Sequence, residues 1–134
     1  AVYEKLLPEL DLLMFDVKVY DEEKHKRWTG VSNRAILENA RRAAKSLPYL
    51  VRTPVIPGVN DTAEEIGAIA GFVHSLGGDL QYYELLRFNP LGEGKYTALD
   101  MANDFAGVRP GPEADTEPLA QAAREAGLAQ VRIG

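Results

Sequence analysis

Two charged side chains of opposite sign close an apolar run, and their spacing is typical of a polar binding site. Asp16 and Lys18 follow the run 12–15. Residues two apart on a β-strand project from the same face, so the carboxylate and the ammonium should lie together. A lysine can donate to hydroxyl or carboxylate oxygens, whereas an aspartate accepts from hydroxyls or holds a cation. A salt bridge or cap at a strand end is the alternative interpretation.

Arg52 is the second candidate, because it lies in the apolar segment 50–56. An arginine inside a buried strand is costly unless it is paired. Its planar fork suits a carboxylate in two-point contact. The alternative is that Arg52 pairs with an internal acid such as Asp16 or Glu84.

Asn89 is the third candidate, since it follows the apolar segment 80–88 and can donate or accept a hydrogen bond. A plain turn residue before the next proline is the alternative. Lys18, Arg52 and Asn89 lie on successive predicted strands or at their carboxyl ends. This distribution favours an anionic ligand held at one face of a barrel.

The elements that would position these residues alternate between strand and helix, which predicts an α/β fold with a mainly parallel sheet. Apolar and capping patterns predict an opening helix, strands over 11–19, 50–56, 80–88 and 131–133, and helices over 32–47, 61–77 and 116–126. Residues 89–112, rich in Gly, Pro and Asp, are expected to form a long loop. The pattern fits a slice of a (β/α) barrel, because four strands cannot close one.

Composition limits the possible functions. The 134 residues carry a net charge of −5 and have a pI near 5.0, so no basic surface for nucleic acid is expected. They include no cysteine, which excludes disulfides, thiolate metal sites and cysteine nucleophiles. No apolar run is long enough to span a bilayer and no signal peptide is evident, so we expect a cytoplasmic protein without membrane contact.

The two histidines lack the spacing of metal ligands. His25 falls in the charged run 21–27 and is expected on a solvated face. His74 lies at a helix end, where a cation suits the helix dipole. Trp28 is interpreted as a loop anchor, with a peptide contact as the alternative.

Four stretches together resemble the C-terminal half of the glycyl-radical-enzyme activating proteins, the pyruvate formate-lyase activating enzyme family. They contain the strings Thr-Gly-Val-Ser-Asn and Pro-Gly-Val-Asn-Asp and span residues 11–18, 23–33, 51–61 and 84–92. The resemblance covers most of residues 1–100. It implies the C-terminal part of a partial (β/α)6 barrel, with residues 1–134 as one region.

The resemblance also implies a chemistry. The family consists of radical S-adenosylmethionine (SAM) enzymes, in which a [4Fe-4S] cluster held by three cysteines cleaves SAM reductively and a glycyl radical enzyme is the partner. Asp16 and Lys18 match an acid and a lysine beside SAM, and Arg52 matches an arginine of the same site. Asn89 stands where the family has a histidine. Without cysteines the chain cannot hold the cluster, and it is expected to be inactive alone.

Two functions therefore stay open at this point. The first is a portion of a radical SAM activating enzyme, favoured by a start inside a helical pattern without Met. The second is a non-catalytic module that binds a glycyl radical enzyme or a nucleotide-like ligand. If the chain is a portion, we expect weak or no SAM binding and self-association through a bare sheet edge.

Overall fold

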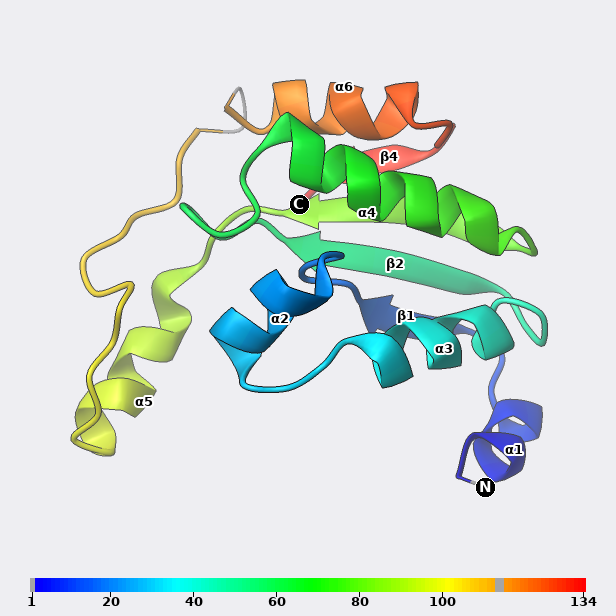
Figure 1. The fold of residues 1–134 in the computed structure, drawn as a ribbon, viewed down its shortest axis with the longest axis horizontal. Coiled ribbons are helices and arrows are strands. Elements are labelled where there is room, and N and C mark those ends of the chain that lie inside the picture. Colours follow the sequence, from blue (N-terminus) through cyan, green and yellow to red (C-terminus); the bar gives the residue numbers. More distant parts are fainter. Residues whose placement is uncertain (1, 113–114) are drawn as a thin grey trace.

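A parallel four-stranded sheet forms the centre of the structure, a computed structural model that describes residues 2–112 and 115–134 (Figure 1). Each strand pairs in parallel with the next along the chain. The strands are β1 (Leu13–Asp16), β2 (Tyr49–Pro54), β3 (Leu80–Leu86) and β4 (Val131–Ile133). The α/β class with parallel strands is thereby confirmed. Strands β1 and β4 are the two outer strands, so the sheet is open at both edges. An open sheet of this kind is compatible with a partial barrel.

The long helices pack on one face of this sheet (Figure 1). The buried core joins Val51 of β2 and Tyr83 of β3 to Ile69 of the longest helix. Because side chains alternate along a strand, Arg52 and Glu84 point to the opposite face. The helices are α2 (Glu22–Thr29), α3 (Arg34–Ala43), α4 (Ala63–Leu76) and α6 (Glu117–Glu125).

A glycine allows the close approach between the end of α3 and the start of β3. Gly78 has φ 68°, a left-handed conformation that favours glycine. A Cβ at this position would lie 2.1 Å from the carbonyl oxygen of Ala44. No side chain fits there without a shift of the backbone.

The charged run 21–27 was expected to form only a solvated face. The structure of helix α2 shows that this expectation was wrong. Asp21 accepts a hydrogen bond from the backbone N–H of Lys24, and Gly30, with φ 78°, ends the helix. His25 is only 4% exposed, and its Nδ1 lies 2.8 Å from the carbonyl oxygen of Val31. The prediction for His25 was wrong because one face of this short polar helix packs inward.

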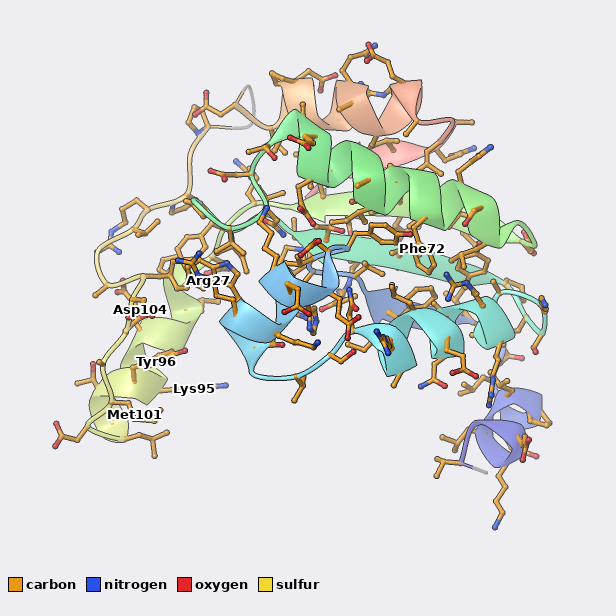
Figure 2. The ribbon with its side chains drawn as sticks, viewed as in Figure 1. Arg27, Phe72, Lys95, Tyr96, Met101 and Asp104 are labelled. Atoms are coloured by element: carbon orange, nitrogen blue, oxygen red, sulfur yellow. The ribbon has the colours of Figure 1, made fainter. Side chains whose placement is uncertain are left out.

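The segment 89–112, predicted as a long functional or ordered loop, contains helical structure that the sequence did not predict. It contains the 3-10 turn η2 (Pro90–Gly92) and helix α5 (Glu93–Ala98), neither of which has a buried residue. The segment extends away from the sheet, with Tyr96 and Met101 far from the long helices (Figure 2). Phe105 attaches it to the body, since its ring lies 6.0 Å from the rings of both Trp28 and Phe88. The interpretation of Trp28 as an anchor is confirmed.

The amino-terminal part is less buried than its sequence predicted. Helix α1 (Val2–Leu6) continues into a 3-10 turn, η1 (Leu7–Glu9). Strand β1 pairs over four residues rather than 11–19, and Leu12 and Met14 are exposed. Within residues 2–112 and 115–134, no helix has the length and apolar character needed to cross a membrane.

Candidate functional site

Three of the four predicted site residues meet on the face of the sheet that lies opposite the long helices. Lys18 Nζ lies 3.1 Å from Asp16 Oδ2, and Arg52 Nη2 lies 3.3 Å from Asp16 Oδ1. Their side chains are partly exposed, at 44% for Lys18, 28% for Asp16 and 32% for Arg52. The salt bridges left open by the sequence are therefore present. A role in ligand binding stays a prediction.

The ion pairs are part of a row of alternating charge that crosses all four strands. Asp16 pairs in register with Arg52, Arg52 with Glu84, and Glu84 with Arg132. The Arg132 guanidinium stacks on the ring of Tyr82, 3.7 Å from the ring centroid. Two acids and two arginines thus share one level of the sheet, which suits a ligand with both charged and polar groups.

Asn89 is not joined to this row by any contact within the described residues. It lies three residues beyond β3, is exposed, and accepts a hydrogen bond from the backbone N–H of Leu91 at 3.0 Å. That bond caps the turn η2. The interpretation of Asn89 as a turn residue is confirmed, and its place beside a ligand stays a prediction.

Asn60 positions the backbone of Lys18. Its side-chain amide donates to the carbonyl oxygens of Lys18 at 2.7 Å and Pro54 at 2.8 Å, and its Oδ1 accepts from the N–H of Ile56. Asn60 is fully buried, so these bonds replace water for the polar atoms of its side chain. The sequence indicated only a turn here. It gave no sign that Asn60 reaches a segment 42 residues away.

On the core side of the sheet, a series of two hydrogen bonds fixes the backbone at the end of β1. Tyr83 Oη donates to Thr53 Oγ1 at 2.8 Å, and Thr53 Oγ1 donates to the carbonyl oxygen of Val17 at 2.7 Å. Burial raises the pKa of the Tyr83 phenol, which therefore stays protonated as a donor. Three strands are tied together directly behind Asp16 and Lys18.

Asn33 supports the same segment from the helix side. Asn33 stands at the N-cap position of helix α3, but its side chain makes no capping bond. Instead its amide donates to the carbonyl oxygens of Val19 at 3.1 Å and Tyr20 at 2.7 Å. The distinctive strings that end in Asn33 and contain Asn60 thus both hold the chain that follows Lys18.

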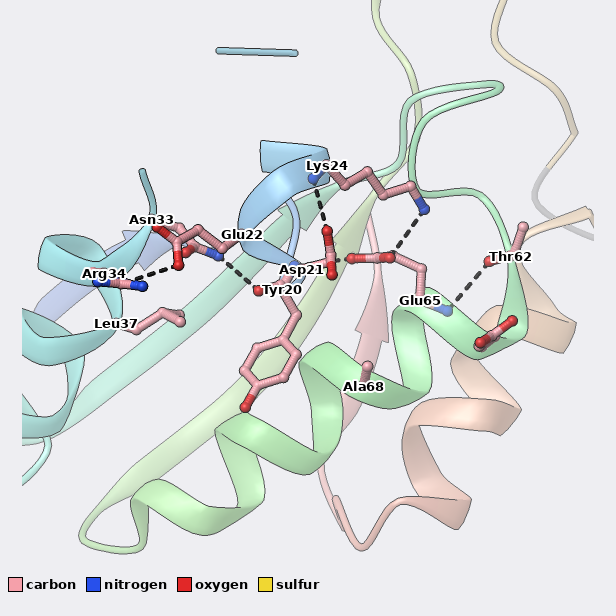
Figure 3. A pocket seen from close by; sticks show the side chains of 11 residues that line it. Tyr20, Asp21, Glu22, Lys24, Asn33, Arg34, Leu37, Thr62, Glu65 and Ala68 are labelled. Atoms are coloured by element: carbon pink, nitrogen blue, oxygen red, sulfur yellow. Dashed lines mark hydrogen bonds and ion pairs between the residues drawn. The ribbon is translucent and has the colours of Figure 1, made fainter. Parts of the chain in front are cut away.

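A groove of about 650 Å³ lies on the helix-covered face, between α2, α3 and α4 (Figure 3). The sequence did not predict it, since it forms from separate segments. Glu65 is central: it is 8% exposed and accepts from the backbone N–H of Tyr20 at 2.9 Å and from Lys24 Nζ at 3.0 Å. Most of the lining residues have polar side chains, and the full set is Tyr20, Asp21, Glu22, Lys24, Asn33, Arg34, Leu37, Thr62, Glu64, Glu65 and Ala68.

The charged groups of this groove largely neutralise one another. Glu22 accepts from Lys26, Ser32 and Arg34, and these contacts, that of Lys26 first, lower its pKa to about 2. Thr62 accepts from the N–H of Glu65, half of the predicted capping box. These contacts therefore stabilise the packing of the helices. The row of charged residues on the other face of the sheet remains the stronger candidate site.

The donor set at Asp16 decides which groups can bind. Among residues 2–112 and 115–134, no three His, Cys, Asp or Glu side chains are arranged around a possible metal site. The sequence contains no cysteine, so an iron–sulfur cluster does not fit this chain. Lys18 and Arg52 carry three and five N–H donors. Both retain donors for a ligand carboxylate while they contact Asp16.

Comparison with known proteins relates this chain to activating enzymes. The isethionate sulfite-lyase activating enzyme of Nitratidesulfovibrio vulgaris is 45% identical over 97 residues, which is 70% of this chain and 31% of that protein. The (2S)-3-sulfopropanediol dehydratase activating enzyme of Klebsiella oxytoca is 41% identical over 108 residues, 79% of this chain and 34% of that protein. Over most of its own length, the chain is homologous to glycyl-radical-enzyme activating proteins. It spans about a third of the length of these curated relatives.

A solved structure agrees with this relationship. A domain of pyruvate-formate lyase-activating enzyme from Bacteroides vulgatus superposes with a TM-score of 0.75 at 26% identity, over 98% of this chain and 71% of that one. The 4-hydroxyphenylacetate decarboxylase activating enzyme of Clostridioides difficile is 39% identical over 78% of this chain and 34% of its own length. No family model matches the sequence.

Proposed function

We propose that this chain is one region, the C-terminal portion, of a radical SAM activating enzyme and supplies part of its SAM site. The observation that carries the proposal is the meeting of Asp16, Lys18 and Arg52 near the carboxyl ends of two parallel strands. Ligands of α/β proteins bind at this end of the strands. The relationship to activating enzymes supplies the ligand class.

The side chains have distinct tasks in this proposal. Lys18 and Arg52 bind the carboxylate of SAM, and Asp16 accepts from a hydroxyl or holds a monovalent cation. Asn89 contributes an amide at the edge of the site. Bound SAM supplies radical chemistry when a [4Fe-4S] cluster reduces it, and a glycyl radical enzyme is the partner. This chain lacks the cysteines for that cluster and is not expected to act alone.

NMR titration of residues 1–134 with SAM tests the proposal, because amide shifts report even millimolar affinity. We expect shifts centred on Asp16, Lys18 and Arg52. Lys18→Ala should weaken binding by roughly tenfold, the effect of losing a charge-assisted hydrogen bond.

Lys45→Ala is the matched control, since Lys45 is an exposed lysine at the end of α3. It should leave the titration unchanged. Shifts confined to the groove in Figure 3, or tight SAM binding that Lys18→Ala leaves unchanged, would overturn the proposal.

A second candidate is a non-catalytic module that binds a glycyl radical enzyme or a nucleotide-like ligand. The absence of cysteine favours it, because such a module needs no cluster. The intact mass of the protein from its source, compared with the encoded reading frame, distinguishes the two. Upstream coding sequence with a Cys-x3-Cys-x2-Cys string supports the activating enzyme.

A further inference from the structure

Glu84 is an ionisable group on the site face that the proposed function does not use. Tyr83 and Leu85 beside it are buried in the core, so Glu84 points to the face that carries Arg52. It is in register with Arg52 on one side and Arg132 on the other. Within residues 2–112 and 115–134 its carboxylate makes no hydrogen bond or ion pair.

The carboxylate of Glu84 lies toward β4 rather than toward Arg52. A Cβ on Gly134 would come within 3.1 Å of Glu84 Oε1. The absence of a side chain at Gly134 therefore leaves room for this rotamer. Since adjacent strands are about 4.8 Å apart, a change of side-chain rotamer is enough to bring Glu84 to the guanidinium of Arg52.

The contact that Arg52 makes with Asp16 is long. Nε and Nη2 both lie 3.3 Å from the single oxygen Oδ1. Strong arginine–carboxylate pairs use two oxygens at about 2.7–2.9 Å. The second oxygen of Asp16 is occupied by Lys18. Asp16 alone therefore does not fix Arg52 in its best geometry.

We infer that Glu84 is a second anchor for Arg52 and acts as a positioning residue of the site. When a hydroxyl or a cation engages Asp16, Glu84 holds the guanidinium at the site, and the remaining N–H donors of Arg52 stay available for the ligand carboxylate. The physical reason is that a partly desolvated guanidinium without a carboxylate is costly. The role of Glu84 in ligand binding rests on the proposed function, but the anchor itself exists without a ligand.

The anchor is tested in the free chain by the Nε–Hε NMR signal of Arg52, assigned by its loss in Arg52→Lys. Asp16→Asn removes the first anchor, and the signal should move but remain sharp and slow to exchange. Asp16→Asn with Glu84→Gln should broaden it or abolish it. Asp16→Asn with Glu64→Gln is the matched control, because Glu64 is an exposed acid at the groove on the other face.

Two results would overturn the anchor: release of Arg52 by Asp16→Asn alone, or no further change on adding Glu84→Gln. Amide spectra of all variants verify that the fold is retained.

A double-mutant cycle tests the effect on SAM binding. Glu84→Gln should raise the Kd for SAM roughly threefold to fivefold, the effect of a partly exposed ion pair. Arg52→Gln should raise it further, and the double variant should equal Arg52→Gln, because Glu84 acts through Arg52.

Additive effects would show that Glu84 contacts the ligand itself and would overturn the positioning role. Normal SAM binding by Glu84→Gln would overturn it too, while leaving the proposed function intact. SAM-induced shifts confined to the groove in Figure 3 would reject the proposed SAM site, and the experiment on the free chain would still decide the anchor.

Discussion

At the scale of single residues, the site is held in place by buried amides as much as by its charged groups. Asn60 and Asn33 donate to four carbonyl oxygens between Lys18 and Pro54. Three of them, those of Lys18, Val19 and Tyr20, belong to the irregular segment that follows β1, and the fourth belongs to Pro54, the last residue of β2. The side-chain amides of Asn33 and Asn60 supply hydrogen-bond donors to these carbonyls, so that the segment after Asp16 keeps one conformation.

Asn60→Ala should destabilise the fold by about 2–4 kcal/mol, because it leaves two carbonyls and one N–H without partners in a buried place. Urea unfolding followed by circular dichroism measures the loss. Asn60→Asp keeps the acceptor for Ile56 but removes the donors, and should be nearly as harmful. Asn89→Ala is the comparison, since its exposed amide makes a single capping bond, and a loss of at most about 1 kcal/mol is expected. Equal stability of the Asn60 and Asn89 variants would contradict this role.

At the scale of elements, the connection between α2 and α3 is stabilised by one carboxylate. Glu22 on α2 contacts Lys26 on the same helix, Ser32 in the connection and Arg34 on α3. Each partner favours the ionised form. The charged run that looked like a plain solvated face therefore contains a specific link between two helices, and this link depends on pH.

The depressed pKa of Glu22 predicts how stability changes with pH. Its pKa falls from 4.5 to about 2 on folding, chiefly through Lys26. The folded state thus binds the proton less tightly than the unfolded state, so the contribution of Glu22 is present above about pH 4.5 and is lost as the pH falls toward 2. Glu22→Gln should be less stable than the unsubstituted chain at neutral pH, and the difference should shrink across that window. Urea midpoints at several pH values provide the measurement.

Glu64→Gln is the control for this pH effect, because Glu64 lines the same groove without an ion pair among the described residues. Its stability difference should not follow the Glu22 window. A Glu22→Gln difference that stays constant from neutral to acid pH would contradict the link.

At the scale of the whole molecule, sequence patterns predicted those features of the fold and the site that depend on the local order of residues along the chain. Alternation along β1 placed Asp16 beside Lys18, and strand–helix alternation gave the parallel sheet. They did not show that Asn60 binds the carbonyl of Lys18, or that Arg52 chooses Asp16 over Glu84. Those contacts join segments more than 30 residues apart, and their partners depend on packing that no local period encodes.

The sheet as a whole predicts self-association. Its long helices lie on one face (Figure 1). On the other face, Met14 of β1, an outer strand of the sheet, is 49% exposed. An open strand edge beside exposed apolar side chains favours pairing with a second copy. We expect light scattering to show a mass above 14.7 kDa that rises with concentration. Met14→Lys should lower that mass by placing a charge beside the edge, whereas Ile36→Lys, at an exposed position on α3, should not. A concentration-independent monomer would contradict self-association, and equal effects of both lysines would show that the contact does not use this face.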